Sequence, residues 1–232
     1  LAYWVHGFIV HPSLERDWVE DQAVLARAEV SGNSVTIRNI RNFNYRSTTD
    51  YDVQYYDKTF DLAKLETAWY IVVPFAGIAS SSAHTMVSFG FEGGDYITIS
   101  PEIRKEKGEA FSPWKGLFRQ YEILYVIADE RDVVKLRSNY RHNDVFVYPV
   151  KASPERMRQV FVSMLERANT LATEPEFYNT LTNSCSTNVV AHVNQVAPGR
   201  VPFSYKVVLP AYSDELAQDL GLIDSSLPIN EL

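Results

Sequence analysis

The sequence has a single cysteine, Cys185, among 232 residues. One thiol cannot form an intramolecular disulfide, and it cannot supply a four-cysteine or cysteine–histidine zinc finger. No stretch approaches the roughly 18 consecutive apolar residues of a membrane-spanning helix. The net charge of −7 disfavours phosphate backbones and anionic lipid surfaces, so we expect no nucleic acid partner. Any membrane contact is expected only through an N-terminal anchor absent from this sequence.

The remaining composition is that of a globular protein with a core. Hydrophobic residues make up 46% of the chain, charged residues 22% and aromatic residues 13%. This length suits one large domain or two small ones, and we expect a single domain over residues 1–232. We expect an N-terminal arm over about 1–34 and a proline-rich C-terminal extension over about 197–232.

Strand signals dominate the first two thirds of the chain. Alternating or continuous apolar runs predict strands at 35–40, 69–73, 85–91, 96–103, 122–128 and 144–150. The Gly93-Gly94 pair predicts an antiparallel hairpin between the runs 85–91 and 96–103. The tyrosine-rich stretch 42–58 is expected to be a long surface loop, and the charged stretch 129–141 a connection between strands.

Helix signals come late in the sequence. Ser153 followed by Pro154 is an N-cap pattern, and an apolar face then repeats through 154–171. A second helix is expected over 183–193, capped by Asn183 or Ser184, and a short one over 213–220. Strands followed by helices predict an α+β fold.

Cys185 follows directly after the expected cap of the second late helix. A thiol at a helix N-terminus lies beside unpaired N–H groups and the positive end of the helix dipole, which lower a thiol pKa. A lone cysteine is more often a small buried apolar residue. The polar run 183–188 around it favours a cleft instead, and we expect a nucleophile there, with Asn183 and Ser184 in oxyanion or positioning roles.

A thiol nucleophile needs a base, and His84 at the start of the hairpin is our candidate among the five histidines. His192 lies seven residues beyond Cys185, about 10 Å along the helix axis, which is too far for a hydrogen bond. The third residue, which orients the imidazole, is expected to be Glu102, with Ser100 and Arg104 as alternatives. A two-residue Gly-Gly turn places His84 opposite Ile103, whereas a one-residue bulge brings Glu102 or Arg104 opposite.

The segments around these residues resemble the bacterial family of the Lnb N-terminal periplasmic domain. The resemblance spans about 38–193 and rests on four segments: AHTMVSFGF at 83–91, SPEIR at 100–104, YVIADERD at 125–132 and FYNTLTNSCST at 177–187. That family is similar in motif order to the permuted NlpC-type branch of the papain-like superfamily, in which histidine precedes cysteine. Where the family has an asparagine directly before the cysteine, this chain has Ser184.

The resemblance implies a papain-like domain in which an antiparallel sheet packs on the helix that begins near the nucleophile. It implies Cys185 as nucleophile and His84 as base of a hydrolase, amidase or acyltransferase that acts through a thioester on an amide or ester of the cell envelope. The expected substrate is a peptide, peptidoglycan or lipid acyl group, the expected location is the periplasm, and no metal or organic cofactor is expected. The alternative is a catalytically inactive binding or structural module of the same fold.

Overall fold

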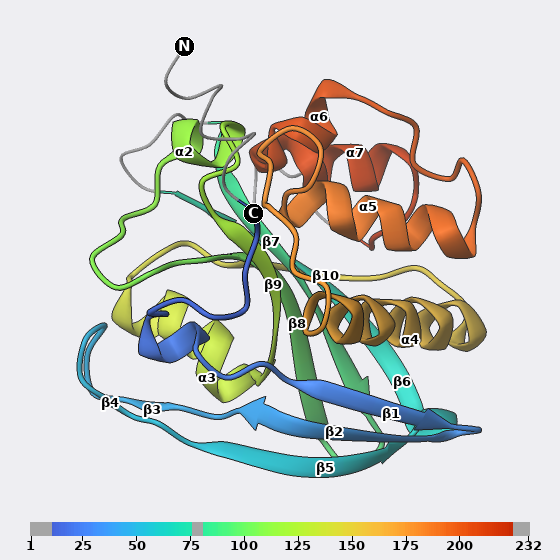
Figure 1. Cartoon of the computed structure of the whole chain (residues 1–232). Coiled ribbons are helices and arrows are strands. Elements are labelled where there is room, and N and C mark those ends of the chain that lie inside the picture. The colour runs from blue at the N-terminus through green and yellow to red at the C-terminus, as the bar shows by residue number, and fades with distance from the viewer. Residues whose placement is uncertain (1–10, 76–80, 225–232) are drawn as a thin grey trace.

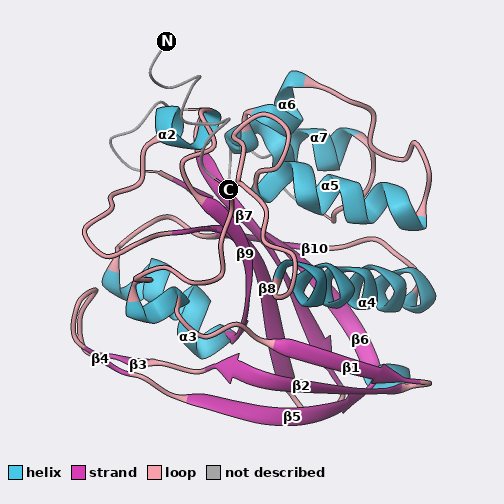
Figure 2. Cartoon of the chain, viewed as in Figure 1, coloured by secondary structure: helices cyan, strands magenta, loops and turns pink. Residues whose placement is uncertain are grey.

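The structure is a computed structural model, and it describes residues 11–75 and 81–224. The chain folds into a mixed α+β domain, as predicted, with helices on both faces of a sheet (Figure 2). The sheet contains β1 (Arg27–Ser31), β2 (Ser34–Arg41), β5 (Tyr55–Asp61), β6 (Leu65–Pro74), β7 (Ala83–Phe91), β8 (Asp95–Arg104), β9 (Glu122–Asp129) and β10 (Phe146–Pro149). The short strands β3 (Asn44–Tyr45) and β4 (Tyr51–Asp52) pair with each other.

The strand order is β1-β2-β9-β8-β7-β6-β10, with β5 paired to β2. The strands β6 to β9 are antiparallel neighbours, while β2 meets β9 in a parallel bridge at Arg41 and Ala128. The predicted hairpin is therefore the centre of the sheet. Within the segment predicted as an N-terminal arm, β1 pairs with β2 at one edge of the sheet.

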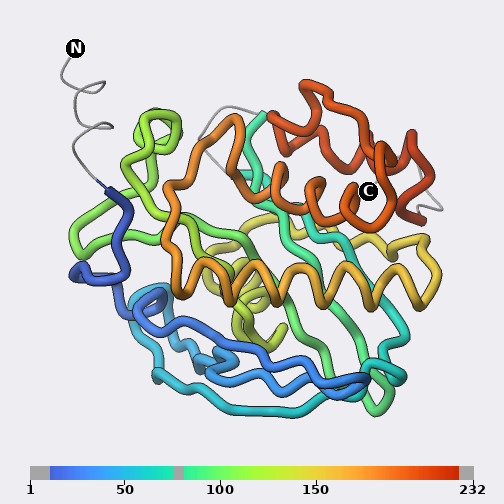
Figure 3. Tube along the Cα trace, turned by 45° about the vertical axis from the view of Figure 1, so that its right-hand side comes forward, coloured from blue at the N-terminus to red at the C-terminus, as the bar shows by residue number. Residues whose placement is uncertain are grey.

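The helices are unequal in length and divide between the two faces. They are η1 (Glu20–Gln22), η2 (Leu62–Lys64), α2 (Pro113–Leu117), α3 (Glu130–Lys135), the π-helical turn η3 (Leu136–Tyr140), α4 (Pro154–Leu171), α5 (Cys185–Val196), α6 (Tyr205–Val208), η4 (Pro210–Tyr212) and α7 (Ser213–Asp219). In Figure 1, α4, α5, α6 and α7 cover one side of the central strands, and α3 lies on the other. Figure 3 shows α4 and α5 side by side, and they are in contact.

The two long helices confirm the sequence predictions. The Ser153 side chain accepts a hydrogen bond from Arg156 N, and Pro154 follows at the first helical position. Phe161, Met164 and Leu165 of α4 are fully buried against the sheet. The predicted short helix 213–220 is also present, as α7.

Two stretches predicted as irregular are ordered elements. The tyrosine-rich stretch 42–58 is not a covering loop: it forms β3, β4 and the start of β5, and its rings pack on one another. Phe43 and Tyr45 each lie 5.3 Å from Tyr51 between ring centroids. Contacts between aromatic side chains stabilise such short strands. The polar composition of this stretch gave no indication of them.

The charged connection 129–141 is helical for most of its length. Asp129 caps α3 by accepting a hydrogen bond from Arg131 N, and the buried Asp132 carboxylate forms an ion pair with Arg41 at 2.8 Å. The charges that suggested an exposed linker include two, Asp132 and Arg137, that are buried and paired. Charged side chains are usually exposed to solvent, so composition alone predicts that both residues lie at the surface.

Candidate active site

Cys185 is the first residue of α5, as predicted from the polar run before it. Ser184, rather than Asn183, caps the helix: the Ser184 side chain accepts from Thr187 N at 3.4 Å, and Thr187 Oγ1 accepts from Ser184 N at 2.7 Å. This reciprocal capping box fixes the point at which the helix begins. It therefore fixes the backbone position of the thiol.

Asn183 has a different function in the loop that precedes the helix. Its side-chain amide donates to Phe177 O at 2.9 Å, and its Oδ1 accepts from Asn188 Nδ2 at 2.8 Å. The side chains of Asn183 and Ser184 thus hold the loop and the cap. Oxyanion stabilisation by either residue stays a prediction.

The Cys185 sulfur lies beside a stretch of β7 at which the sheet opens. The ladder between β7 and β8 ends at the pair Val87 and Ile99, although β7 stays paired with β6 as far as Ala83 and β8 stays paired with β9 as far as Arg104. The sulfur lies 4.0 Å from Ala83 O on this opened stretch. The first residue of α5 and the first residues of β7 therefore meet where two neighbouring strands have separated.

His84 also belongs to this stretch, and its ring is held by a chain of polar contacts. His84 Nε2 lies 2.7 Å from Ser100 Oγ, and Ser100 Oγ donates to Glu102 Oε1 at 2.8 Å. Because the one hydroxyl hydrogen of Ser100 points to Glu102, the hydroxyl oxygen accepts from His84, and the proton of a neutral ring is on Nε2. The lone pair is then on Nδ1, the nitrogen that can act as base.

Glu102 is the end of this relay. Its Oε1 lies 3.7 Å from His84 Nε2 and accepts a hydrogen bond from Arg137 Nη2 at 2.8 Å. Glu102 and its alternative Ser100 therefore both lie at the imidazole. Their catalytic roles stay predictions.

The hairpin register explains why Glu102 reaches the imidazole. Phe91 pairs with Asp95 across a three-residue turn in which Gly93 and Gly94 both have positive φ, so of the two registers left open by the sequence the one with an additional residue is present. The additional residue in the turn shifts the register by one position. This shift brings Glu102, rather than Ile103, level with His84.

Arg104, the other alternative, lies away from the imidazole. Its guanidinium stacks on the Trp18 ring at 4.2 Å and donates to Gln22 O and Ala23 O. Arg104 anchors the segment around η1 to β8. It takes no part in the His84 relay.

The structure does not join the imidazole to the thiol. Both residues are described, and no hydrogen bond links Cys185 to His84. Strand alternation places the His84 side chain with Met86, on the face that packs against Val133 of α3, whereas Val87 faces the helices on the other side. The expected Cys185–His84 contact is therefore absent in this state, with the ring drawn toward Ser100.

Burial and neighbouring charges together set the charge states of the three titratable groups. It raises the pKa of the Cys185 thiol, an effect that Thr85 N–H and the Thr85 hydroxyl partly offset, so the expected lowering by the helix end is not realised. Burial, followed by the Arg137 charge, lowers the pKa of His84 to about 3. For Glu102, burial favours the neutral acid, but Arg137 and His84 outweigh it and hold the pKa well below its usual range. At neutral pH the site holds a thiol, a neutral imidazole and a carboxylate.

The three other histidines in the described part of the chain take no part in this site. His192 bonds Tyr125 OH at 2.8 Å and Ser163 Oγ at 2.7 Å, which agrees with the prediction that it does not reach the thiol. His11 and His142 are exposed. His6 lies outside the described residues.

Sequence reasoning missed Arg137 and Thr85. Arg137 lies in the stretch interpreted as a linker, and only the helical spacing of its apolar neighbours Val133 and Leu136 could have indicated burial. Thr85 directly follows His84, and the sequence indicates only that it is a strand residue. Alternation along β7 places its side chain on the face opposite the imidazole.

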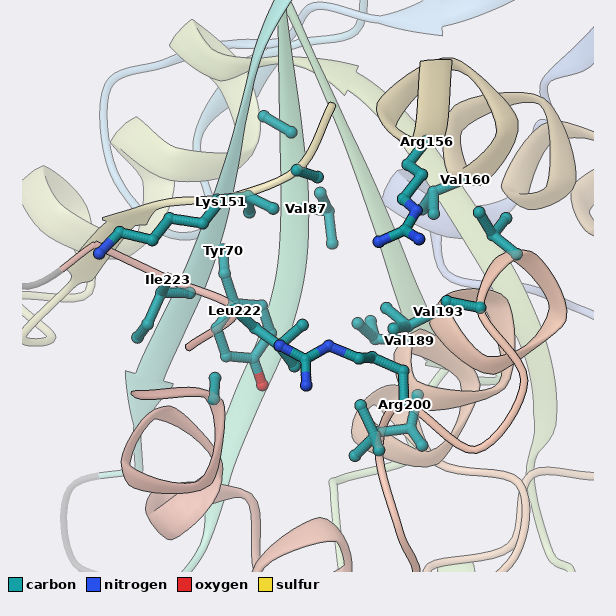
Figure 4. Close-up of a pocket in the computed structure, with 18 of the residues that line it drawn as sticks. Tyr70, Val87, Lys151, Arg156, Val160, Val189, Val193, Arg200, Leu222 and Ile223 are labelled. Atoms are coloured by element: carbon teal, nitrogen blue, oxygen red, sulfur yellow. The ribbon is translucent and has the colours of Figure 1, made fainter. Parts of the chain in front are cut away.

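An apolar cavity of about 180 Å³ adjoins the site between the sheet and α4, α5 and α7 (Figure 4). Val87, Val189 and Val193 line it, together with Ser186, the residue after the cysteine, and Tyr70. Burial raises the pKa of Tyr70, and the proximity of the Cys185 sulfur contributes, so this cavity-lining residue is also near the thiol. Arg156 and Arg200 extend into the open side of the cavity.

No group of three or more acidic, histidine or cysteine side chains suited to a metal ion occurs among the residues that the structure describes. Over the same residues, no helix has the length and apolar character needed to cross a membrane.

The comparisons with known proteins give one match. A family model described as the Lnb N-terminal periplasmic domain matches residues 51–211, a span that includes the His84 relay, Cys185 and most of the cavity. The searches of curated proteins and of solved structures found no match.

Proposed function

The chain belongs to the family of the Lnb N-terminal periplasmic domain, and from this premise we propose that it is a thiol-dependent hydrolase or acyltransferase of the bacterial cell envelope. Its fold is then a permuted papain-like one, and its place of action is the periplasm. The supporting observation is that Cys185 at the start of α5 meets the opened stretch of β7 that carries His84. A helix N-terminus and an oriented imidazole on a neighbouring strand are the parts that thiol acyl transfer requires.

The reaction uses a neutral thiol and a neutral imidazole as its starting groups. The pKa of the thiol is raised and that of His84 is lowered to about 3, so a stable thiolate–imidazolium pair does not form before substrate arrives. We infer that the ring turns around the open edge of β7, and that the thiol proton passes to Nδ1 of His84 as sulfur attacks the carbonyl carbon.

The new carbon–sulfur bond places negative charge on the carbonyl oxygen. Collapse of this intermediate breaks the bond to the leaving group, which takes the proton from His84 and leaves a thioester on Cys185. Water or an acceptor amine then attacks the thioester carbonyl and gives its proton to His84. The carbon–sulfur bond breaks, the acid or amide product leaves, and His84 returns the proton to the sulfur to restore the thiol. Before the ring turns, Ser100 and Glu102 hold the neutral imidazole with its proton on Nε2 and its lone pair on Nδ1.

The apolar cavity favours an acyl chain over a peptide as the group transferred. A peptide substrate requires polar partners for its backbone, whereas the valine-rich lining offers almost none. The cavity reaches Ser186 and Tyr70, next to the thiol, so a chain bound there carries its carbonyl carbon toward Cys185.

One observation favours a second candidate, an inactive binding module of the same fold. The Cys185 residue is 5% exposed, and burial raises the pKa of its thiol. A structural thiol has the same properties. The experiment below separates the two candidates.

The test is capture of the acyl-enzyme. Incubation with p-nitrophenyl octanoate and intact-mass spectrometry should show one octanoyl adduct that hydroxylamine removes, which C185A does not form. An adduct that persists in C185A, or no adduct in the wild type after prolonged incubation, would favour the inactive module.

The length of the acyl chain tests the role of the cavity. We expect p-nitrophenyl octanoate to acylate Cys185 at least about tenfold faster than the acetate, because each buried methylene contributes about 0.8 kcal/mol. Val193→Phe, which fills the cavity, should remove this preference, and V147F, on an exposed strand position, should keep it. Equal rates for the two esters would refute the acyl-chain assignment and leave the nucleophile in place.

A further inference from the structure

Thr85 is a fully buried residue whose hydroxyl makes no hydrogen bond of normal geometry with any residue that the structure describes, although it lies close enough to interact with Tyr70 and with the Cys185 sulfur. The exposure of Thr85 is 0%. Native proteins satisfy nearly all buried hydroxyls, so an exception calls for an explanation. Thr98 on β8 is the other threonine in this condition.

The position of Thr85 supplies an explanation that does not apply to Thr98. Alternation on β7 directs Thr85 to the same face as Ala83 and Val87, the face on which α5 packs. The Cys185 sulfur lies 4.0 Å from Ala83 O, two residues before Thr85. The Thr85 N–H and hydroxyl are the groups that most favour a charged Cys185 sulfur.

We propose that Thr85 is a catalytic residue whose hydroxyl donates a hydrogen bond to the Cys185 sulfur as the thiol loses its proton. This inference rests on the proposed function. The unpaired hydroxyl is a donor held ready for a charge that exists only during the reaction, since a neutral thiol is a weak acceptor and a thiolate a strong one. An apolar residue of the same shape cannot replace it.

The substitution Thr85→Val removes the hydroxyl and keeps the shape of the side chain. Because it removes an unpaired buried hydroxyl, it should leave stability unchanged or raise it. Thr98→Val is the matched control, with the same chemistry, the same burial and the same lack of a partner. Thr85→Ser restores the donor and should restore the wild-type behaviour.

The measurement is the titration of the single thiol, which needs no substrate. Alkylation by iodoacetamide is followed by intact mass from pH 7 to pH 11, and the Raman S–H band provides a second titration that needs no reagent access. T85V should shift the midpoint upward by about one pH unit or more, which is about a tenfold lower alkylation rate below the midpoint. T98V and T85S should titrate as the wild type does.

A midpoint that is the same in T85V and wild type overturns the inference, as does an equal shift in T98V. Neither result affects the proposed function, which is tested separately by whether the wild type is acylated and whether that acylation requires Cys185. If T85V proves unstable, Thr85→Ala, which also removes the hydroxyl, is titrated in its place: an upward shift supports the inference, and a wild-type midpoint overturns it.

Discussion

The His84 imidazole and the Glu102 carboxylate approach to 3.7 Å, with the Ser100 hydroxyl between them. Since Ser100 donates its one hydrogen to Glu102, it must accept from Nε2, and the lone pair of the neutral ring is then on Nδ1. The ring is thereby oriented by residues on the neighbouring strand. This relation is the basis of the first prediction.

At pH 7, His84 should be neutral with its proton on Nε2. Two-bond ¹H–¹⁵N correlation spectra distinguish the tautomers directly. Ser100→Ala removes the acceptor and should produce a mixture of tautomers, while Glu102→Gln should weaken the preference less. A ring protonated on Nδ1 in the wild type would contradict the relay.

The fold should lose stability as the solution is acidified. The pKa of His84 is about 3 in the folded chain against an ordinary 6.5, so the unfolded chain takes up a proton that the folded chain refuses. The contribution of His84 to the free energy of unfolding is therefore fully present above about pH 6.5 and is lost as the pH falls toward 3. The loss between pH 7 and pH 4 is about 3 kcal/mol. Glu102, whose pKa is lowered, acts in the same direction below its ordinary value.

Urea unfolding at pH 7, 6, 5 and 4 measures this loss. His84→Gln keeps a side-chain N–H toward Ser100 but cannot titrate, and its stability should fall less steeply. The matched variant His11→Gln, at an exposed position, should follow the wild type. A wild-type stability that does not change from pH 7 to pH 4 would contradict the assigned charge states.

Arg137→Met should destabilise the fold and raise the pKa of His84. The Arg137–Glu102 pair is buried, with side chains 6% and 16% exposed, and removal of one partner from such a pair costs about 3–5 kcal/mol. Loss of the arginine charge also removes the second cause of the low pKa of His84. Arg46→Met, in a solvent-exposed ion pair, should leave stability nearly unchanged. NMR titration of His84 and urea unfolding provide the two readouts, and an unchanged His84 pKa in R137M would be the contrary result.

Ser184→Ala should cost about 1 kcal/mol, because it removes the cap of α5. Ser184→Asn should keep most of that stability, since asparagine caps a helix as well as serine does. Thermal unfolding compares the three proteins. Equal losses in S184A and S184N would indicate that the capping box, rather than the cap alone, carries the stabilisation.

Much of the fold could be predicted from the sequence because local signals agreed with the packing. Ser153-Pro154 and the apolar face that follows specify α4, and the polar run before Cys185 specifies where α5 begins. The tyrosine-rich strands and α3 could not be predicted in this way. Their stability comes from ring stacking and from buried ion pairs such as Arg41 with Asp132, which depend on residues distant in the sequence.

The candidate site shows the same division. Cys185, His84 and Glu102 could be chosen by residue type and by position on a helix or hairpin, but the register depended on a turn of three residues rather than two. The direction of the thiol pKa could not be predicted, because it depends on burial, and burial exceeds the effect of the helix end. The separation of β7 from β8 gives no local signal in either strand.

The most direct test of the account is the rate at which p-nitrophenyl octanoate acylates Cys185 in wild type, H84Q and H11Q. His84→Gln retains the contact with Ser100 and lacks only the basic nitrogen. The account predicts a rate lower by on the order of 10²-fold in H84Q, with H11Q unchanged. Equal rates in all three proteins would contradict it, because His84 would then not be the base that serves Cys185.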